Sequence, residues 1–195
     1  KASELIYKAI DLNPKYKDAY INLSGILKDL GRLEEAERII SKAIELDPSN
    51  AILYSNLSYI LMELGKIDYA ECIVKKSLDI DPKLAIAYFY LGKINIYKNN
   101  SLAAKSFFSK ALEINSNYPE VICNLGIIEM SEGNFIKAEL SFLRSIEIKP
   151  DYINPYYELS TFIDYTKYSN LEKRLTESKV FQNNTLEEDI YLYFA

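Results

Sequence analysis

Apolar residues recur every three or four positions through most of the chain, a spacing that is typical of amphipathic helices. Two such helices alternate with short breaks in residues 17–50, and the same pattern returns in residues 51–84. A period of 34 residues predicts stacked helical hairpins, each of which buries its apolar face against the next. The anchor positions of the first stretch and their counterparts in the second are Tyr20, Leu23, Ser24, Gly31, Ala36, Ile40, Ala43 and Pro48, then Tyr54, Leu57, Ser58, Gly65, Ala70, Val74, Ser77 and Pro82.

Glycine, proline and small residues set the ends and the contacts of each hairpin. Gly31, Gly65 and Gly133 stand where the first helix should end and turn. Proline stops the second helix, because it lacks an amide donor and clashes with the preceding turn; these prolines are Pro14, Pro48, Pro82 and Pro150. Small residues should mark the close approach of the two helices. They are Ser24, Ser58, Gly92, Gly126 and Ser160 in the first helices and Ala36, Ala70, Ala104 and Ala138 opposite them.

This register divides the whole chain. Residues 1–16 match the second half of a truncated repeat, and 17–50, 51–84, 85–118 and 119–152 are four full repeats. Residues 153–182 form a degenerate repeat, and 183–195 begin a further, truncated helix. Capping-box spacings, Ser169 with Glu172 and Thr185 with Glu188, predict helices from about 170 and 186. The first helix lacks its partner, so either residues are missing before it or something packs on its apolar stripe. The apolar C-terminal stretch looks like a cut within a longer protein, or else it is buried against the fifth repeat.

The pattern resembles the tetratricopeptide repeat (TPR) over roughly residues 1–165. That signature places a large residue, Leu, Gly, a large residue, Ala, an aromatic, Ala and Pro at fixed offsets, and residues 17–50 depart from it only by Ser24 for Gly and Ile40 for the aromatic. The resemblance implies an all-α fold, a right-handed α-solenoid or superhelix of stacked helical hairpins. It also implies that the first helices line a concave face that binds other proteins.

Later repeats carry polar residues where the earlier ones have leucine. These are Asn95, Lys98, Glu129 and Glu132. Such side chains either make a polar contact between neighbouring first helices or, more simply, are solvated. The sequence leaves both alternatives open.

Asparagine recurs at the sixth position of the repeat, which the resemblance places on the concave face. The residues there are Asn22, Asn56, Tyr90, Asn124 and Glu158. Together with the phrases DAYINL and LGRLEEAE, this is similar to the repeat region of O-linked N-acetylglucosamine transferases, where an asparagine ladder holds the backbone of an extended peptide. An Asn amide both donates and accepts, so it can pair with a peptide group of any sequence. The alternative is that these asparagines are inherited consensus without a ligand.

Spacing and energy both bear on this ladder. Neighbouring helices pack about 8 to 10 Å apart, so asparagines on successive first helices would meet about every third residue of a chain that advances about 3.3 Å per residue. Three Asn contacts of about 0.5 to 1.5 kcal/mol each fall short of the roughly 8 kcal/mol of a micromolar complex. Apolar anchors must therefore contribute, and the concave positions offer Tyr59, Phe89, Tyr90, Ile127 and Tyr157, with Lys93 beside them. The tyrosines at the fourth position, Tyr20, Tyr54, Tyr88 and Tyr156, should instead face the partner helix as core.

Composition narrows the classes of function. The net charge is −5 with acidic and basic residues interleaved, which argues against a nucleic-acid partner. The chain has no run of 18 apolar residues that could span a membrane. It has no histidine, the commonest general base near neutral pH and the commonest metal ligand, so we expect no catalysis, cofactor or metal. Cys72 and Cys123 fall at different phases of the repeat and should remain free thiols, which favours the cytoplasm.

These observations predict a non-catalytic scaffold that holds an extended protein or peptide ligand in the concave groove. Two alternatives remain. The chain could be the substrate-selecting arm of a larger transferase, a glycosyltransferase or a sulfotransferase, because residues 156–175 and 183–195 resemble the junction after the repeats in bacterial TPR sulfotransferase proteins. It could also self-associate through exposed terminal helices.

Overall fold

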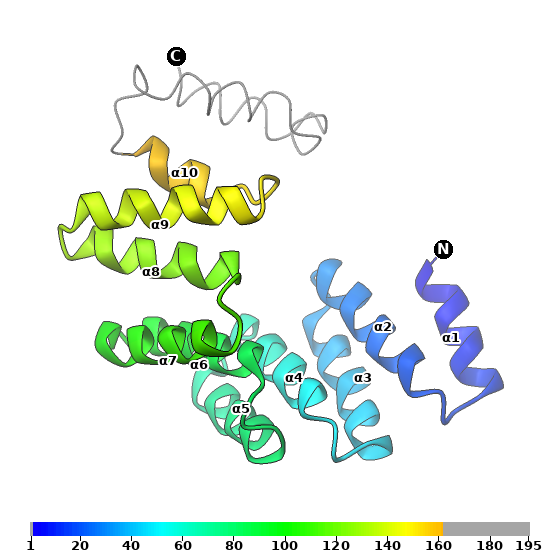
Figure 1. Cartoon of the computed structure of the whole chain (residues 1–195). Helices are drawn as coiled ribbons and strands as arrows, with labels where there is room; N and C mark the ends of the chain where they lie inside the picture. The colour runs from blue at the N-terminus through cyan, green and yellow to red at the C-terminus, as the bar shows by residue number, and fades with distance from the viewer. Residues whose placement is uncertain (1, 162–195) are drawn as a thin grey trace. The chain divides into compact units, whose positions relative to one another are not determined.

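The computed structural model describes residues 2–161, with side chains from residue 5 onward, and divides the chain into two units, residues 1–114 and 115–195. Each unit is described by itself. Across residues 2–161 all regular secondary structure is α-helical (Figure 1). The helices of the first unit are α1 (Ala2–Leu12), α2 (Lys17–Asp29), α3 (Leu33–Leu46), α4 (Ala51–Glu63), α5 (Ile67–Ile80), α6 (Ala85–Tyr97) and α7 (Ser101–Ile114). Those of the second are α8 (Pro119–Ser131), α9 (Phe135–Ile148) and α10 (Asn154–Ser160).

The helices pair as hairpins that stack within each unit. In the first unit α2 packs on α3, α4 on α5 and α6 on α7, and successive hairpins meet through α3 with α4 and α5 with α6. Helix α4 also contacts α6, so these two first helices of successive hairpins are neighbours. In the second unit α8 packs on α9, and α10 contacts both. The expected all-α solenoid of stacked hairpins is confirmed.

Turn chemistry explains where the helices end. Gly31, Gly65 and Gly133 have φ values of 72°, 72° and 79°, the left-handed region that a side chain disfavours. The third hairpin has no glycine at this place, and Asn99 adopts φ 55° instead, which asparagine tolerates better than most residues. Each second helix that precedes a proline stops two residues before it, at Leu12, Leu46, Ile80 and Ile148.

The small residues of the first helices face the aromatic position of the second helices. A Cβ at Gly92 would stand 2.2 Å from Cε1 of Phe108, and one at Gly126 would stand 2.7 Å from Cε1 of Phe142. Ala104 and Ala138 are fully buried, as expected, but the phenylalanine rings are what require glycine. In the first two hairpins serine takes the place of glycine, and the residues at the ring position are Ile40 and Val74.

Each tyrosine at the fourth position of a repeat closes the loop that precedes its helix. The hydroxyl donates to the carbonyl oxygen of the proline six residues earlier, with O···O distances of 3.0 Å for Tyr20, 3.1 Å for Tyr54, 3.2 Å for Tyr88 and 3.0 Å for Tyr156. Tyr20 and Tyr156 are buried, as expected of core residues. Tyr54 and Tyr88 make the same hydrogen bond but are only half-buried.

Two buried serines tie the second helix of a hairpin to the start of the first. Ser77 Oγ donates to the carbonyl oxygen of Ala51 at 2.7 Å and lies 2.8 Å from Ser55 Oγ. Ser145 Oγ donates to the carbonyl oxygen of Pro119 at 2.9 Å. These hydroxyls are therefore satisfied although they replace the alanine of the repeat pattern.

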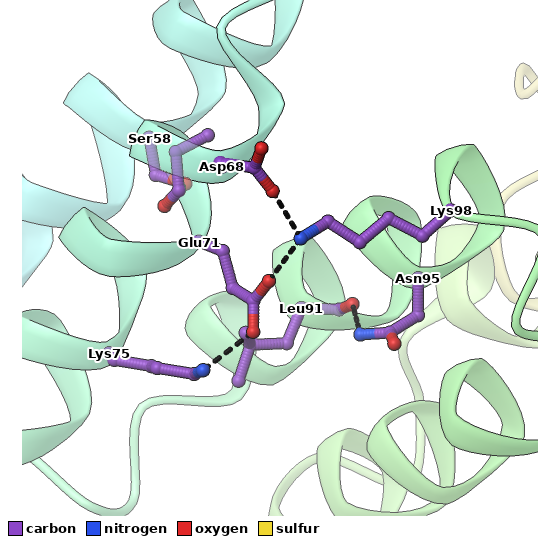
Figure 2. Close-up of polar contacts among 8 residues, drawn as sticks. Ser58, Asp68, Glu71, Lys75, Leu91, Asn95 and Lys98 are labelled. Carbon is purple, nitrogen blue, oxygen red and sulfur yellow. Dashed lines mark hydrogen bonds and ion pairs between the residues drawn. The ribbon is translucent and has the colours of Figure 1, made fainter.

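The polar residues of the third repeat do not simply face solvent (Figure 2). Lys98 Nζ lies 2.6 Å from Asp68 Oδ1 and 2.6 Å from Glu71 Oε2, so it joins the end of α6 to α5, and Lys75 pairs with the other oxygen of Glu71. Asn95 donates to the carbonyl oxygen of Leu91 in its own helix at 2.8 Å. Lys98 is thus exposed, as the solvation alternative expected, but it also pairs with carboxylates on a second helix and not on a neighbouring first helix.

Some expectations lie outside the described residues. The helices predicted from about 170 and 186 fall within residues 162–195, of which the structure describes nothing. Among the helices of residues 2–161 none is long and apolar enough to cross a membrane. Cys72 and Cys123 are both free thiols.

Candidate functional site

A small pocket opens between α2, α4 and α6 in the first unit. Its volume is about 110 Å³. The lining residues come from three successive first helices, the elements that the repeat pattern places on the concave face. They are Ile21, Ser24, Gly25, Lys28, Asn56, Tyr59, Ile60 and Tyr90.

The wall on α2 follows from helical spacing. Ile21, Gly25 and Lys28 are four and three residues apart, so they share one face of the helix. A Cβ at Gly25 would meet no atom within 4 Å beyond its chain neighbours and its own helix backbone. The middle of this wall is therefore open where any other residue would project a side chain.

Aromatic rings form the opposite side of the pocket. The rings of Tyr59 and Tyr90 stack with centroids 5.5 Å apart and 23° between their planes. Tyr90 also contacts Phe89, whose ring centroid lies 6.1 Å from that of the buried Phe108. The half-buried stack is thus held by the packed core beneath it, which fixes the orientation of the rings.

One lysine and two carboxylates, Lys28, Asp29 and Glu63, lie around the Tyr59 ring. Lys28 Nζ lies 5.1 Å from the centroid of the Tyr59 ring, a cation–π contact, and 3.1 Å from Asp29 Oδ1. Burial raises the pKa of Tyr59, and Glu63 and Asp29 raise it further, so the phenol stays neutral. The one cation that lines the pocket therefore already has a carboxylate partner.

The structure brings together only part of the predicted site. Asn56 is half-buried and lines the pocket with Tyr59 and Tyr90. Asn22 is exposed and does not line it, because it follows Ile21 by one residue and therefore points about a quarter-turn away. Phe89 does not line the pocket, but its ring contacts that of Tyr90, and Lys93 is half-buried on α6 outside the pocket lining.

Three predicted residues belong to the second unit. Asn124 Nδ2 donates to the carbonyl oxygen of Glu120, one turn back in α8, at 2.7 Å, which engages one of its two amide hydrogens. Ile127 packs against the core of this unit, and Tyr157 is 47% exposed on α10. Glu158 shares the repeat position of the asparagines, and burial raises its pKa.

Gly25, Ile21 and Lys28 were absent from the residues predicted for the site. A signal for Gly25 was nonetheless present in the sequence, since a glycine in mid-helix is unfavourable and the ninth position of the other repeats carries Tyr59, Lys93 and Ile127.

Among residues 5–161 no three His, Cys, Asp or Glu residues gather where they could hold a metal ion. Burial raises the pKa of the Cys123 thiol to about 12, so it is a poor nucleophile at neutral pH.

Stacked helical hairpins with a pocket across their first helices define a repeat protein of the interaction-scaffold class. A family profile described as "Tetratricopeptide repeat" matches residues 17–50, 85–118 and 119–152, more than half of the chain. A second profile of the same description matches residues 40–71. The chain belongs to the tetratricopeptide repeat family.

Several solved structures are similar to this chain. YrrB, described as a TPR protein with an unusual peptide-binding site, is 25% identical over 89% of this chain and 89% of its own, with a TM-score of 0.57. TTC0263, a thermophilic TPR protein of Thermus thermophilus, is 19% identical over 82% of this chain and 88% of its own, with a TM-score of 0.73. The Cut9–Hcn1 complex of APC/C is 18% identical over 96% of this chain and 38% of that chain, with a TM-score of 0.79. The last two likenesses establish the fold alone.

No curated protein matches the sequence. None of the matches above is to the repeats of an O-linked N-acetylglucosamine transferase or a sulfotransferase, so that narrower resemblance stays a prediction.

Proposed function

We propose that this chain is a non-catalytic scaffold that holds an extended polypeptide across the first helices of its first unit. The observation that carries the proposal is the pocket in which the Asn56 amide lies beside the stacked rings of Tyr59 and Tyr90. A scaffold of this class binds its ligand through the shape of its surface and the side chains on it. The pocket provides a recess lined by an amide and two aromatic rings.

The two kinds of side chain have complementary roles. The Asn56 amide can donate to and accept from a peptide group whatever the ligand sequence is. A hydrogen bond of this kind adds about 0.5 to 1.5 kcal/mol, which is too little for stable binding by itself. Tyr59 and Tyr90 add apolar area, and their rings are already ordered, so binding loses little side-chain entropy.

The likeness to YrrB supports a peptide as the class of ligand. YrrB is described as having an unusual peptide-binding site and is similar to this chain over 89% of both. We further propose Asn22, Phe89 and Lys93 as contacts along the same ligand. Within the second unit by itself, Asn124, Ile127 and Tyr157 are proposed as peptide contacts. The cytoplasm is the proposed location, on the ground of two free cysteines.

A random dodecapeptide library displayed on phage tests the proposal with the whole chain as bait. We expect related sequences to be enriched and their synthetic peptides to bind with measurable affinity by fluorescence anisotropy. Asn56→Ala should weaken that affinity by about two- to tenfold. Asn117→Ala, on the exposed loop before α8, is the matched control and should bind as the wild type does.

Two results would count against this account. Enrichment of no sequence family would contradict the scaffold function. Equal affinity of the wild type and Asn56→Ala would remove Asn56 from the contact while leaving the groove. The transferase-arm alternative uses the same groove and is distinguished by the full-length gene, which would encode the transferase domain.

A further inference from the structure

Gly25 lies in the middle of α2 without a packing reason to be glycine. A Cβ there would meet no atom within 4 Å beyond its chain neighbours and its own helix backbone, and the residue lacks the positive φ of Gly31 and Gly65. Gly92 differs, because Phe108 fills the space above it. Glycine in a helix is less stable than alanine. Position 25 therefore carries an unfavourable residue whose structural consequence is an open pocket.

The neighbouring repeats show what a side chain at this register does. Tyr59, at the corresponding place in α4, projects into the same pocket and forms its aromatic wall. A side chain of similar reach at position 25 would extend into the pocket from α2 and fill it. The absence of one leaves about 110 Å³ in front of Tyr59 and Tyr90.

We propose that this pocket is the specificity subsite of the groove and takes one uncharged aliphatic side chain from the bound polypeptide. The inference rests on the proposed function. The volume is well below the roughly 300 to 1,000 Å³ of sites for small-molecule ligands. It equals the space of about four water molecules at about 30 Å³ each, which suits a single side chain of leucine size.

The lining favours an aliphatic group over a charged one. Ile21, the buried Ile60 and the rings of Tyr59 and Tyr90 form the apolar part of the lining, beside the polar groups of Ser24, Lys28 and Asn56. A basic ligand side chain would meet Lys28, and an acidic one would compete with Asp29, which already pairs with Lys28 at 3.1 Å. An acidic side chain would lose its hydration without gaining an unshared partner, and a basic one would lose its hydration beside Lys28, with only the exposed Glu63 near the Tyr59 ring to compensate.

Gly25→Leu tests the subsite directly, because it places an aliphatic side chain of the protein's own in the pocket. It also replaces a poor helix former with a good one, so the variant should unfold at the same or a higher temperature than the wild type. Loss of binding then reports a filled pocket and not a misfolded protein. Glu45→Leu adds the same side chain to an exposed position of α3 and is the matched control.

The probes are the tightest peptide selected on the wild type and its variants with the aliphatic anchor replaced by Ala, Asp or Lys. We expect each replacement to weaken binding to the wild type at least tenfold. Gly25→Leu should bind the parent peptide at least tenfold more weakly and should no longer distinguish it from the alanine variant. Glu45→Leu should match the wild type.

Equal affinity and equal anchor dependence of Gly25→Leu and the wild type would overturn the subsite while leaving the groove. Selection of peptides that share only charged residues would also overturn it. If no peptide family is enriched on the wild type, the subsite and the proposed function are both wrong. The missing enrichment distinguishes this result from a failure of the subsite alone.

Discussion

Gly92 on α6 and Phe108 on α7 fit together so closely that a Cβ on the glycine would stand 2.2 Å from the ring. The ring is fully buried, and Ala104, one turn before it on α7, is fully buried as well. A tight contact of this kind sets how closely the two helices of a hairpin approach. Gly25 lies at the next repeat position in α2 and has no such contact, so the two glycines predict opposite effects of one substitution.

Gly92→Ala should lower the free energy of unfolding by about 1 to 3 kcal/mol, because the new methyl group must displace the ring of Phe108. Gly25→Ala should raise it by about 0.5 to 1 kcal/mol, because only the helix propensity changes. Urea unfolding followed by circular dichroism measures both. Destabilisation by both variants to the same extent would show that Gly25 has a packing role, contrary to this account.

The first two hairpins suggest a compensating pair. Ser58 takes the place of glycine where Val74 takes the place of the ring, and the Ser58 hydroxyl donates to the carbonyl oxygen of Ala70 at 2.9 Å. We therefore expect Gly92→Ser combined with Phe108→Val to be more stable than the sum of the two single changes implies, by about 0.5 to 3 kcal/mol. A double-mutant cycle in urea measures this coupling. Strict additivity would contradict the proposed fit.

The left-handed turn residues predict a second contrast. Gly65→Ala should lower the free energy of unfolding by about 1 to 2 kcal/mol, because φ is 72° there and alanine disfavours that region. Asn99→Gly should leave the free energy unchanged or raise it, because glycine adopts the observed φ of 55° without strain. A gain in stability on Gly65→Ala would show that the turn relaxes to another conformation.

The ion pairs of Lys98 should contribute little, because they are partly exposed (Figure 2). Lys98→Met is expected to lower the free energy of unfolding only slightly at low salt and by less in 1 M NaCl, where charges are screened. Lys76→Met, at an exposed position of α5, is the control. An effect of Lys98→Met that is independent of salt would show that packing of its side chain, and not its charge, is what matters.

The two cysteines should differ in reactivity. Cys72 is exposed, whereas Cys123 is buried and has a pKa of about 12, so it stays protonated at pH 8. Mass spectrometry after a short treatment with N-ethylmaleimide at pH 8 should show one adduct on the native protein and two in urea. Two rapid adducts on the native protein would mean that the core around Cys123 opens readily.

Much of the fold could be predicted because its determinants are local. Gly31 and Gly65 terminate helices through their own φ angles, and Pro48 and Pro82 through their own missing donors, so each residue carries its signal alone. In the third hairpin Asn99 holds the turn position that Gly65 holds in the second, and the glycine pattern does not predict this. Asparagine tolerates the same conformation without requiring it.

The site could be predicted only in part, because it depends on which side chains of neighbouring helices meet. The repeat register identified Asn56, Tyr59 and Tyr90, which do line one pocket. The register also selected Asn22, because it shares the repeat position of Asn56. The wall on α2 is instead formed by Ile21, the residue before Asn22, and by Gly25. The pocket exists because residue 25 has no side chain. The repeat register indicates only positions whose side chains could bind a ligand, so it could not indicate this one.

The most direct test of the central claim is a titration of the selected peptide into the ¹⁵N-labelled protein, followed by amide chemical shifts. Gly25 is a useful reporter, because the chain has only six glycines. The account predicts that the amides of Gly25, Asn56, Tyr59 and Tyr90 shift in the wild type, and that those of Asn56, Tyr59 and Tyr90 shift much less in Gly25→Leu at the same peptide concentration. Shifts confined to α3, α5 and α7, with none at these four residues, would contradict it.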